Sequence, residues 1–291
     1  MIHSNTPNSV NGLTSNEALN LAPLGKQSAY INTYTPSLLF PIPRKPKRDE
    51  IHLSESLPFI GYDIWTGFEL SWLNSKGKPV VAIAEFIIPC ESKNIVESKS
   101  FKLYLNSFNN THFESFEHVH TVLQKDLSQC TQTPIEVKLF KLDEASDKIT
   151  YLSGKCIDDL DVECNKYQPE TSYLTTSQDP VDRVEESFYT NLLKSNCLVT
   201  GQPDWGSIQI QYKGPRICQK GLLKYIVSLR DHNEFHEQCV ERIFTDIQRL
   251  CQPEWLTVYA RYTRRGGLDI NPFRTNQKDK ACPQNVRLIR Q

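Results

Sequence analysis

The feature of this chain that most constrains its fold is a faint internal repeat. Similar residues recur 121 positions apart, in the pairs Val96 and Ile217, Lys99 and Lys220, Tyr104 and Tyr225, Leu105 and Ile226, and Ser107 and Ser228. After one inserted residue, Phe113 corresponds to Phe235. Self-similarity at a fixed spacing is the mark of a duplicated structural unit. Because each copy reads as strands followed by a helix, the repeat predicts a duplicated α+β module.

Hydrophobic periodicity assigns elements to each copy. In the first copy it predicts strands at 67–73, 80–88 and 100–108, followed by a helix that begins near Phe113. In the second copy it predicts strands near 208–212, 221–229 and 256–261, and a helix over 235–250. Asp231 and Glu234 have the spacing of a capping box at the start of that second helix.

The repeat and the local composition divide the 291-residue chain into four parts. Residues 1–56 are rich in Ser, Asn and Pro and are expected to form an extended surface arm. Residues 57–142 are the first module and 181–291 the second. The acidic stretch 143–180 has few apolar residues in register, which is typical of a connecting region.

Composition excludes several classes of function. With a formal net charge of −1 there is no global positive field to hold a nucleic acid. No apolar run is long enough to span a membrane, and the polar N-terminus lacks the pattern of a signal peptide, so we expect a cytoplasmic protein. The nine cysteines form no CxxC pair, which indicates free thiols and no metal site. His236 and Cys239 could share a helix face, but two ligands do not make a structural zinc site.

The repeat fails at several polar positions, and there it suggests a site. In this alignment Glu97 corresponds to Cys218, and Cys197 corresponds to Lys76. His236 and Glu237 fall opposite Glu114 and Ser115. Two half-sites, each retaining what the other copy lost, would form one complete site between the modules. The alternative is chance divergence of an old repeat.

Cys197 is the candidate nucleophile. It lies in SNCLVTGQPDWG, where a Thr-Gly-Gln-Pro turn separates it from Asp204, and a thiol on such a loop can be exposed. A thiolate nucleophile needs access, and a carboxyl group brought back by the turn would supply an acid partner. The alternative is an inert core cysteine.

His236 and Glu237, in the first helical turn, could bind the edge of a flat heterocycle or could simply favour the helix start. Lys99 and Lys102 could likewise be the solvated face of a strand.

Four segments in order closely resemble the 7-cyano-7-deazaguanine reductases, the nitrile reductases of queuosine biosynthesis, in their long two-module form. These segments are ESKSFKLYLNSF at 97–108, CLVTGQPDW at 197–205, FHE at 235–237 and YTRRGGLDINPFR at 262–274. The resemblance spans roughly 57–291. It implies two tandem tunnelling-fold modules, with antiparallel sheets and helices packed on one face, and no zinc. It also suggests a homodimer.

The same resemblance implies a role for each matched residue. Cys197 would form a covalent thioimide with the nitrile, Asp204 would protonate the nitrile nitrogen, and His236 would bind the base and could also move protons. The residues implied to bind the deazapurine substrate are Val96, Glu97, Ser98, Phe235, His236 and Glu237. Those implied to contact NADPH are Ser98, Lys99, Arg265 and Gly266. No GxGxxG follows a strand, so the cofactor would not use a Rossmann site.

Two rival functions remain open at this level. A cysteine nucleophile on a nitrile could lead to hydrolysis, but that reaction needs a general base, commonly a Glu and a Lys beside the cysteine. The surroundings of Cys197 offer Lys194 and Asp204 instead. A non-catalytic purine-binding module would keep Glu237 and have no use for Cys197.

Overall fold

The computed structural model describes residues 30–145, 149–179 and 181–291, so residues 1–29 of the predicted arm lie outside the described residues. The described chain forms two compact units. Unit 1 contains residues 30–52, 67–88 and 92–145, and unit 2 contains residues 53–66, 89–91, 149–179 and 181–291. Each unit combines antiparallel strands with a few helices, so the chain is of the α+β class.

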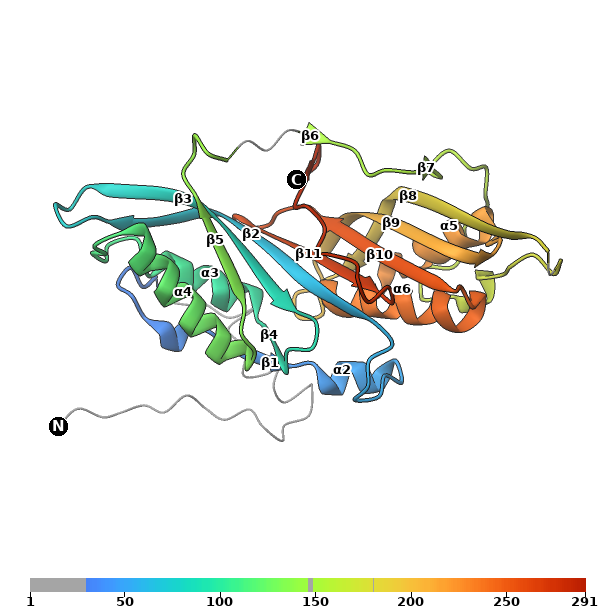
Figure 1. Cartoon of the computed structure of the whole chain (residues 1–291), viewed down its shortest axis with the longest axis horizontal. Coiled ribbons are helices and arrows are strands. Elements are labelled where there is room, and N and C mark those ends of the chain that lie inside the picture. The colour runs from blue at the N-terminus through green and yellow to red at the C-terminus, as the bar shows by residue number, and fades with distance from the viewer. Residues whose placement is uncertain (1–29, 146–148, 180) are drawn as a thin grey trace. The chain divides into compact units, whose positions relative to one another are not determined.

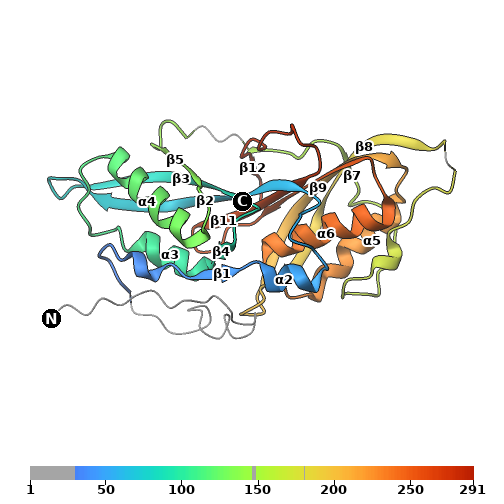
Figure 2. The ribbon, with the colours of Figure 1, turned by 60° about the horizontal axis from the view of Figure 1, so that its bottom comes forward.

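Unit 1 packs two helices on a small sheet. The elements assigned to it are η1 (Pro36–Leu38), β1 (Pro41–Pro43), α2 (Lys45–Glu50), the second half of β2 (Ile60–Leu73), β3 (Pro79–Pro89), β4 (Asn94–Val96), α3 (Ser98–Asn106), α4 (Phe116–Thr131) and β5 (Glu136–Phe140). Strand β3 lies between β2 and β5 and pairs antiparallel with β5, while β1 and β4 form a separate antiparallel pair. Both α3 and α4 lie on the same face of the sheet (Figures 1 and 2).

Unit 2 repeats this plan with longer strands. Its elements are β6 (Ile149–Thr150), β7 (Lys155–Cys156), η2 (Thr171–Tyr173), β8 (Arg183–Asn196), β9 (Pro203–Pro215), α5 (Gln219–Ser228), η3 (Leu229–Asp231), α6 (His236–Cys251), β10 (Trp255–Tyr262), β11 (Leu268–Thr275) and β12 (Arg287–Leu288). The sheet order is β11-β10-β9-β8-β7, antiparallel except for β7 with β8. Helices α5 and α6 share one face of it (Figure 2).

Two predicted strands are helices, which corrects the reading of the sequence. The segment 100–108 lies mostly in α3, and 221–229 lies mostly in α5. Phe101, Tyr104 and Leu105 are buried and have the three- and four-residue spacing of one helix face. Their aromatic and apolar content resembled a strand, but the 3.6-residue period decides the structure. The other predicted strands and both predicted helices are present.

The matched residues of the repeat make the same contacts in both units. The Tyr104 hydroxyl donates to Asp126 Oδ2 at 2.7 Å, and the Tyr225 hydroxyl donates to Asp246 Oδ2 at 2.7 Å. The next helix of each unit has 16 residues and ends in a left-handed glutamine, at Gln132 in α4 and at the corresponding residue of α6. A buried tyrosine bound to a carboxylate therefore ties the two helices together in each copy.

This comparison corrects the register of the repeat beyond the first helix of each copy. Helices α4 and α6 begin at Phe116 and His236, so His236 corresponds to Phe116 and not to Glu114. Strands β2 and β8 both have 14 residues, and the residue that follows the strand is Asn74 in one copy and Cys197 in the other. The predicted match of Cys197 with Lys76 is therefore wrong. Small insertions in the turns shift a fixed offset by one or two residues.

The predicted capping box of the second helix is also wrong. Asp231 belongs to η3, and the N-cap of α6 is Phe235, whose side chain makes no capping hydrogen bond. Glu234 is buried, and its Oε1 accepts from Arg242 Nε at 2.6 Å and lies 2.9 Å from His232 Nε2. The Glu234 carboxylate, which the sequence pattern assigned to the helix cap, instead binds Arg242 on α6.

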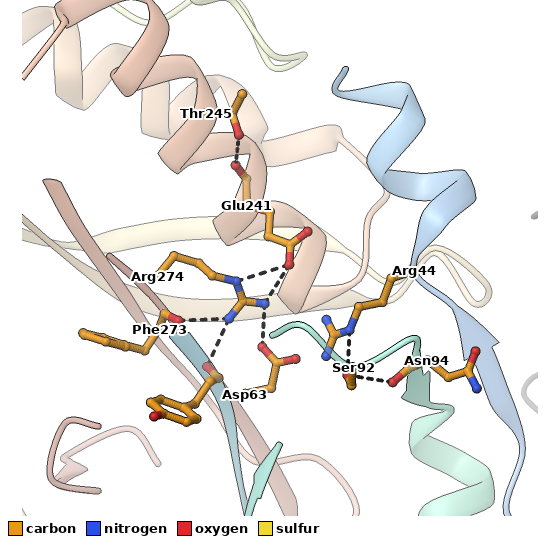
Figure 3. A network of polar contacts seen from close by, with 9 residues as sticks. Arg44, Asp63, Ser92, Asn94, Glu241, Thr245, Phe273 and Arg274 are labelled. Carbon is orange, nitrogen blue, oxygen red and sulfur yellow. Dashed lines mark hydrogen bonds and ion pairs between the residues drawn. The ribbon is translucent and has the colours of Figure 1, made fainter. Parts of the chain in front are cut away.

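A buried arginine at the end of the YTRRGGLDINPFR segment holds α6 to two strands within unit 2 (Figure 3). Arg274 Nη2 lies 2.8 Å from Asp63 Oδ1 on β2 and 2.9 Å from Glu241 Oε1 on α6. Burial alone would lower the pKa of Arg274, but the two carboxylates raise it above its ordinary value. Figure 3 also shows a smaller contact in unit 1, where Arg44 Nε donates to Ser92 Oγ at 3.0 Å.

Candidate active site

The β8–β9 hairpin positions the candidate nucleophile and acid. Ser195 pairs with Asp204 in this hairpin, so the acid lies opposite a residue two positions before Cys197. The turn is closed by two hydrogen bonds, from Cys197 N to Gln202 O at 2.8 Å and from Gly201 N to Cys197 O at 2.9 Å. Gly201 has φ of 65°, a conformation that favours glycine. The predicted turn is present, and it brings Asp204 back beside the chain that carries the thiol.

Cys197 is more buried than its polar surroundings suggested. Only 6% of the residue is exposed, whereas the sequence was read as placing the thiol on an open loop. The polar residues that precede Cys197 do not reveal this burial, because it depends on contacts beyond the local sequence. A water-poor position suits a reactive thiol, because a reactive adduct there is protected from hydrolysis.

Asp204 is held by two cationic or potentially cationic side chains. Its Oδ1 lies 2.5 Å from Arg265 Nη2, and its Oδ2 lies 3.3 Å from His236 Nε2. Arg265 Nη1 also donates to Gln202 Oε1 at 3.1 Å, which links the arginine to the Cys197 turn. Unit 2 therefore brings four predicted residues into one cluster: Cys197, Asp204, His236 and Arg265.

His236 lies flat against Tyr262. The two ring centroids are 3.8 Å apart and the ring planes differ by 4°. Burial raises the pKa of Tyr262 well above its usual value, so its hydroxyl stays protonated. Neither ring nitrogen of His236 has a partner in the described residues with full hydrogen-bond geometry. The stack fixes the imidazole plane, with Nε2 facing Asp204 and Nδ1 able to donate to or accept from a ligand.

The start of α6 adds a carboxylate to this cluster of residues. Glu237 is buried in the first turn of the helix, next to the half-buried Phe235. The unpaired backbone N–H groups at a helix start favour negative charge. A carboxylate stabilised there can accept hydrogen bonds from the N–H edge of a flat base.

The predicted residues of unit 1 gather at the start of α3. Glu97 is its N-cap and accepts from Lys99 N at 2.7 Å and from Ser100 N at 2.8 Å. Burial raises the pKa of Glu97, while those backbone hydrogen bonds act in the opposite direction. Val96 is buried on β4, whereas Ser98 and Lys99 are partly exposed in the first helical turn. Capping is thus a structural role for Glu97 that the strand interpretation had hidden.

Sequence reasoning missed two residues that organise the site. Tyr262 carries the His236 ring, and Gln202 accepts from Arg265. Both lie within the segments YTRRGGLDINPFR and CLVTGQPDW, but nothing in their local pattern shows which side chains they contact. Strand pairing and helix packing bring them to the site.

Possible metal ligands and the lysine nearest Cys197 also lie among the described residues. Among residues 30–145, 149–179 and 181–291, no three His, Cys, Asp or Glu side chains are grouped to hold a metal ion. Burial raises the pKa of Cys239 to about 12, which disfavours the thiolate that zinc requires. Lys194 Nζ, the lysine nearest Cys197 in sequence, donates to Arg230 O at 2.5 Å.

No described helix is long and apolar enough to cross a membrane.

Comparisons with known proteins agree on one family. Residues 30–139 match the family described as "Nitrile reductase, 7-cyano-7-deazaguanine-reductase N-term", and residues 203–281 match "QueF-like protein". Proteins named NADPH-dependent 7-cyano-7-deazaguanine reductase are similar over 273 residues, at 58% identity in Cupriavidus metallidurans and 59% in Ralstonia nicotianae. Each alignment covers 93% of this chain and 98% of that protein. A solved structure of archaeosine synthase QueF-Like in the apo form covers 33% of this chain and 95% of that chain, with 13% identity and a TM-score of 0.29.

Proposed function

The chain belongs to the 7-cyano-7-deazaguanine reductase family, and on that premise we propose that it reduces the nitrile of 7-cyano-7-deazaguanine to 7-aminomethyl-7-deazaguanine. The reaction consumes two NADPH and proceeds through a thioimide on Cys197, as a step of tRNA queuosine biosynthesis. The observation that carries the proposal is the hairpin that folds Asp204, paired with His236, back toward the buried Cys197.

The nitrile of the base is a weak electrophile, and Cys197 and Asp204 together make it reactive. The thiol adds across the C≡N bond, so that an Sγ–C bond forms and nitrogen gains a proton. Asp204 must carry that proton at the moment of attack. When NADPH is bound it supplies the hydride, once to the thioimide and once to the imine that remains after the thiolate leaves. The burial of Cys197 protects the imine from water between the two transfers.

The base is held by carboxylates and an imidazole. Glu97 and Glu237 are buried and present oxygens that accept hydrogen bonds, and the His236 ring, held flat against Tyr262, has its Nδ1 without a hydrogen-bond partner in the described residues. Phe235 packs against the plane of the base, and Val96 and Ser98 complete its surroundings. A donor-rich deazaguanine edge matches this set, because ionised carboxylates accept hydrogen bonds and donate none.

Arg265 in unit 2 and the start of α3 in unit 1 each carry groups that suit a phosphate. The Arg265 side chain is 45% exposed, and Gly266 and Gly267 beside it have φ of 61° and 78°. A forked guanidinium next to a turn without side chains lets phosphate approach the backbone. Ser98 and Lys99 lie in the first turn of α3, where backbone N–H groups favour anions. These four residues are the proposed NADPH contacts: Ser98, Lys99, Arg265 and Gly266.

The finer architecture is proposed on the same premise. The modules predicted at 57–142 and 181–291 are tandem tunnelling-fold units, joined by the connecting region at 143–180. The predicted arm at 1–56 is not extended throughout, because Pro41–Pro43 pair with β4 and Lys45–Glu50 form α2. The enzyme acts in the cytoplasm as a homodimer on a small deazapurine, without direct contact with nucleic acid or membrane. Matched tyrosine–aspartate pairs support the duplicated module.

Intact-mass measurement with 7-cyano-7-deazaguanine tests the proposed reaction. The expected result is an adduct equal to the mass of the base, mapped to Cys197 and released as the primary amine when NADPH is added. Cys197→Ala should bind the base, form no adduct and oxidise no NADPH. Cys156→Ala, which replaces an exposed cysteine, is the matched control and should behave as wild type. No adduct and no NADPH oxidation in the wild type would refute the function, and an amide or acid product would replace it by hydrolysis.

A further inference from the structure

Each carboxylate oxygen of Asp204 lies beside a cationic or potentially cationic side chain in this structure. Oδ1 lies 2.5 Å from Arg265 Nη2, and Oδ2 lies 3.3 Å from His236 Nε2. The Asp204 side chain is 6% exposed, so water has little access to replace either partner. An acid that is to reach a nitrile nitrogen needs one oxygen free to turn toward it. Of these two contacts only that of Arg265 has hydrogen-bond geometry, so Oδ1 becomes free when the guanidinium moves away.

Arg265 is the partner that can leave. The stack on Tyr262 fixes the His236 ring, and that side chain is 11% exposed, whereas the Arg265 side chain is 45% exposed. Arg265 lies in the β10–β11 turn, closed by a hydrogen bond from Arg265 N to Leu268 O at 2.8 Å. Its guanidinium contacts Gln202 and the buried Asp204, but nearly half of the side chain is exposed, so a ligand in solvent can reach it. A phosphate group is a competitive partner for the same guanidinium.

We propose that Arg265 is a positioning residue that holds Asp204 away from the nitrile until a cofactor phosphate draws the guanidinium off. The inference rests on the proposed function and adds an order of events to it. Cofactor binding frees Oδ1 of Asp204, so the acid becomes available when the hydride donor is in place. Without cofactor, the Arg265 ion pair slows formation of the adduct.

The step that Arg265 controls is balanced without any redox partner. The Cys197 Sγ bonds to the nitrile carbon, and one π bond of C≡N breaks, placing its electron pair on nitrogen. The freed Oδ1 of Asp204 takes the thiol proton and passes it to that nitrogen. The net change is addition of S–H across the triple bond. Because nothing is oxidised or reduced, the oxidised cofactor NADP⁺ can serve as a probe without turnover.

The test measures the rate of adduct formation at a fixed concentration of 7-cyano-7-deazaguanine, with and without saturating NADP⁺. NADP⁺ should accelerate adduct formation in the wild type. Arg265→Ala should form adduct roughly two- to fivefold faster than wild type without cofactor, the range expected for a partly exposed ion pair. NADP⁺ should not accelerate this variant further, and its half-saturating NADPH concentration should rise about tenfold for the lost phosphate contact.

Two further variants separate this role from a structural one. Arg264→Ala removes the same charge one residue away, from a side chain that donates to Gln291 O, and should keep the NADP⁺ response. Arg265→Lys keeps the charge and should restore part of the response. If Arg265→Ala slows adduct formation, or if NADP⁺ leaves the wild-type rate unchanged, the inference is wrong. A wild type that forms no adduct at all would instead refute the proposed function.

Discussion

Replacing Arg274 with methionine tests the buried network that holds α6 in unit 2. Methionine keeps much of the length of the side chain and its packing near Phe59, whose ring centroid lies 5.6 Å from the guanidinium carbon. It removes the cation that Asp63 and Glu241 share at 2.8 Å and 2.9 Å. The variant therefore removes the cation, together with its hydrogen bonds to the Tyr62 and Phe273 carbonyls, and keeps most of the volume.

The expected loss of stability is large because all three side chains are buried. The Arg274 side chain has no exposed surface, and those of its two partners are 1% and 3% exposed. Removing one member of a buried ion pair costs about 3–5 kcal/mol, since the remaining charge keeps its desolvation penalty. Arg249→Met is the matched control, because its single pair with Asp246 has an arginine side chain that is 61% exposed. That variant should lose no more than about 1 kcal/mol.

Urea unfolding at 25 °C measures both variants, followed by tryptophan fluorescence and by circular dichroism. Agreement of the two probes establishes that one transition is compared. An Arg274→Met protein within about 1 kcal/mol of wild type would contradict the reasoning, since it would mean that the carboxylates do not depend on this cation. Adding Asp63→Asn and Glu241→Gln to Arg274→Met should recover most of the loss, because no uncompensated charge of the network then remains.

Two other outcomes follow from the local geometry. Burial raises the pKa of Glu97 in the folded protein above its usual 4.5. Folding stability is therefore lost as pH rises through the folded-state pKa, because the buried carboxyl group must ionise. The anion that binds the base is lost as pH falls through the same pKa. As pH is lowered, affinity for the base should therefore begin to decrease while the pH is still above 4.5; calorimetry in a Cys197→Ala background measures it. Glu97→Gln should remove this pH dependence. An unchanged profile in Glu97→Gln would exclude Glu97 as the titrating group. Gln132 and Gln252 have φ of 56° and 48° at helix ends, so glycine at either position should raise the free energy of unfolding by about 0.5–1 kcal/mol in urea titrations, and a loss of stability would contradict the strain argument.

The sequence predicted two α+β units of similar plan, and the structure has two compact units, but the elements within each were predicted only in part. Alternating and helical periods identified β9 and α6, because one face of each is buried over many residues. Helices α3 and α5 were mistaken for strands, since their short aromatic and apolar runs fit both periods. Glu97 caps α3 with two backbone hydrogen bonds, but Glu is not a typical N-cap residue, so its type did not indicate a helix start.

The sequence by itself determined which chemical groups this protein has and which of them are neighbours along the chain. Cys197 and Asp204 are brought near by a short turn, whose Gly201 permits the required left-handed backbone. The glycines beside Arg265 act in the same local way. Such features are legible in a few consecutive residues because turn geometry depends on local backbone preferences.

Only the tertiary structure decided what those groups contact. Asp204, His236, Tyr262 and Arg265 come from two strands, a helix and a turn, and they meet because β9 pairs with β10 while α6 packs beneath that sheet. The ion pair that occupies Asp204 and the stack that fixes His236 arise from strand register and helix packing. Both are set by contacts between distant parts of the chain, which no short sequence pattern records.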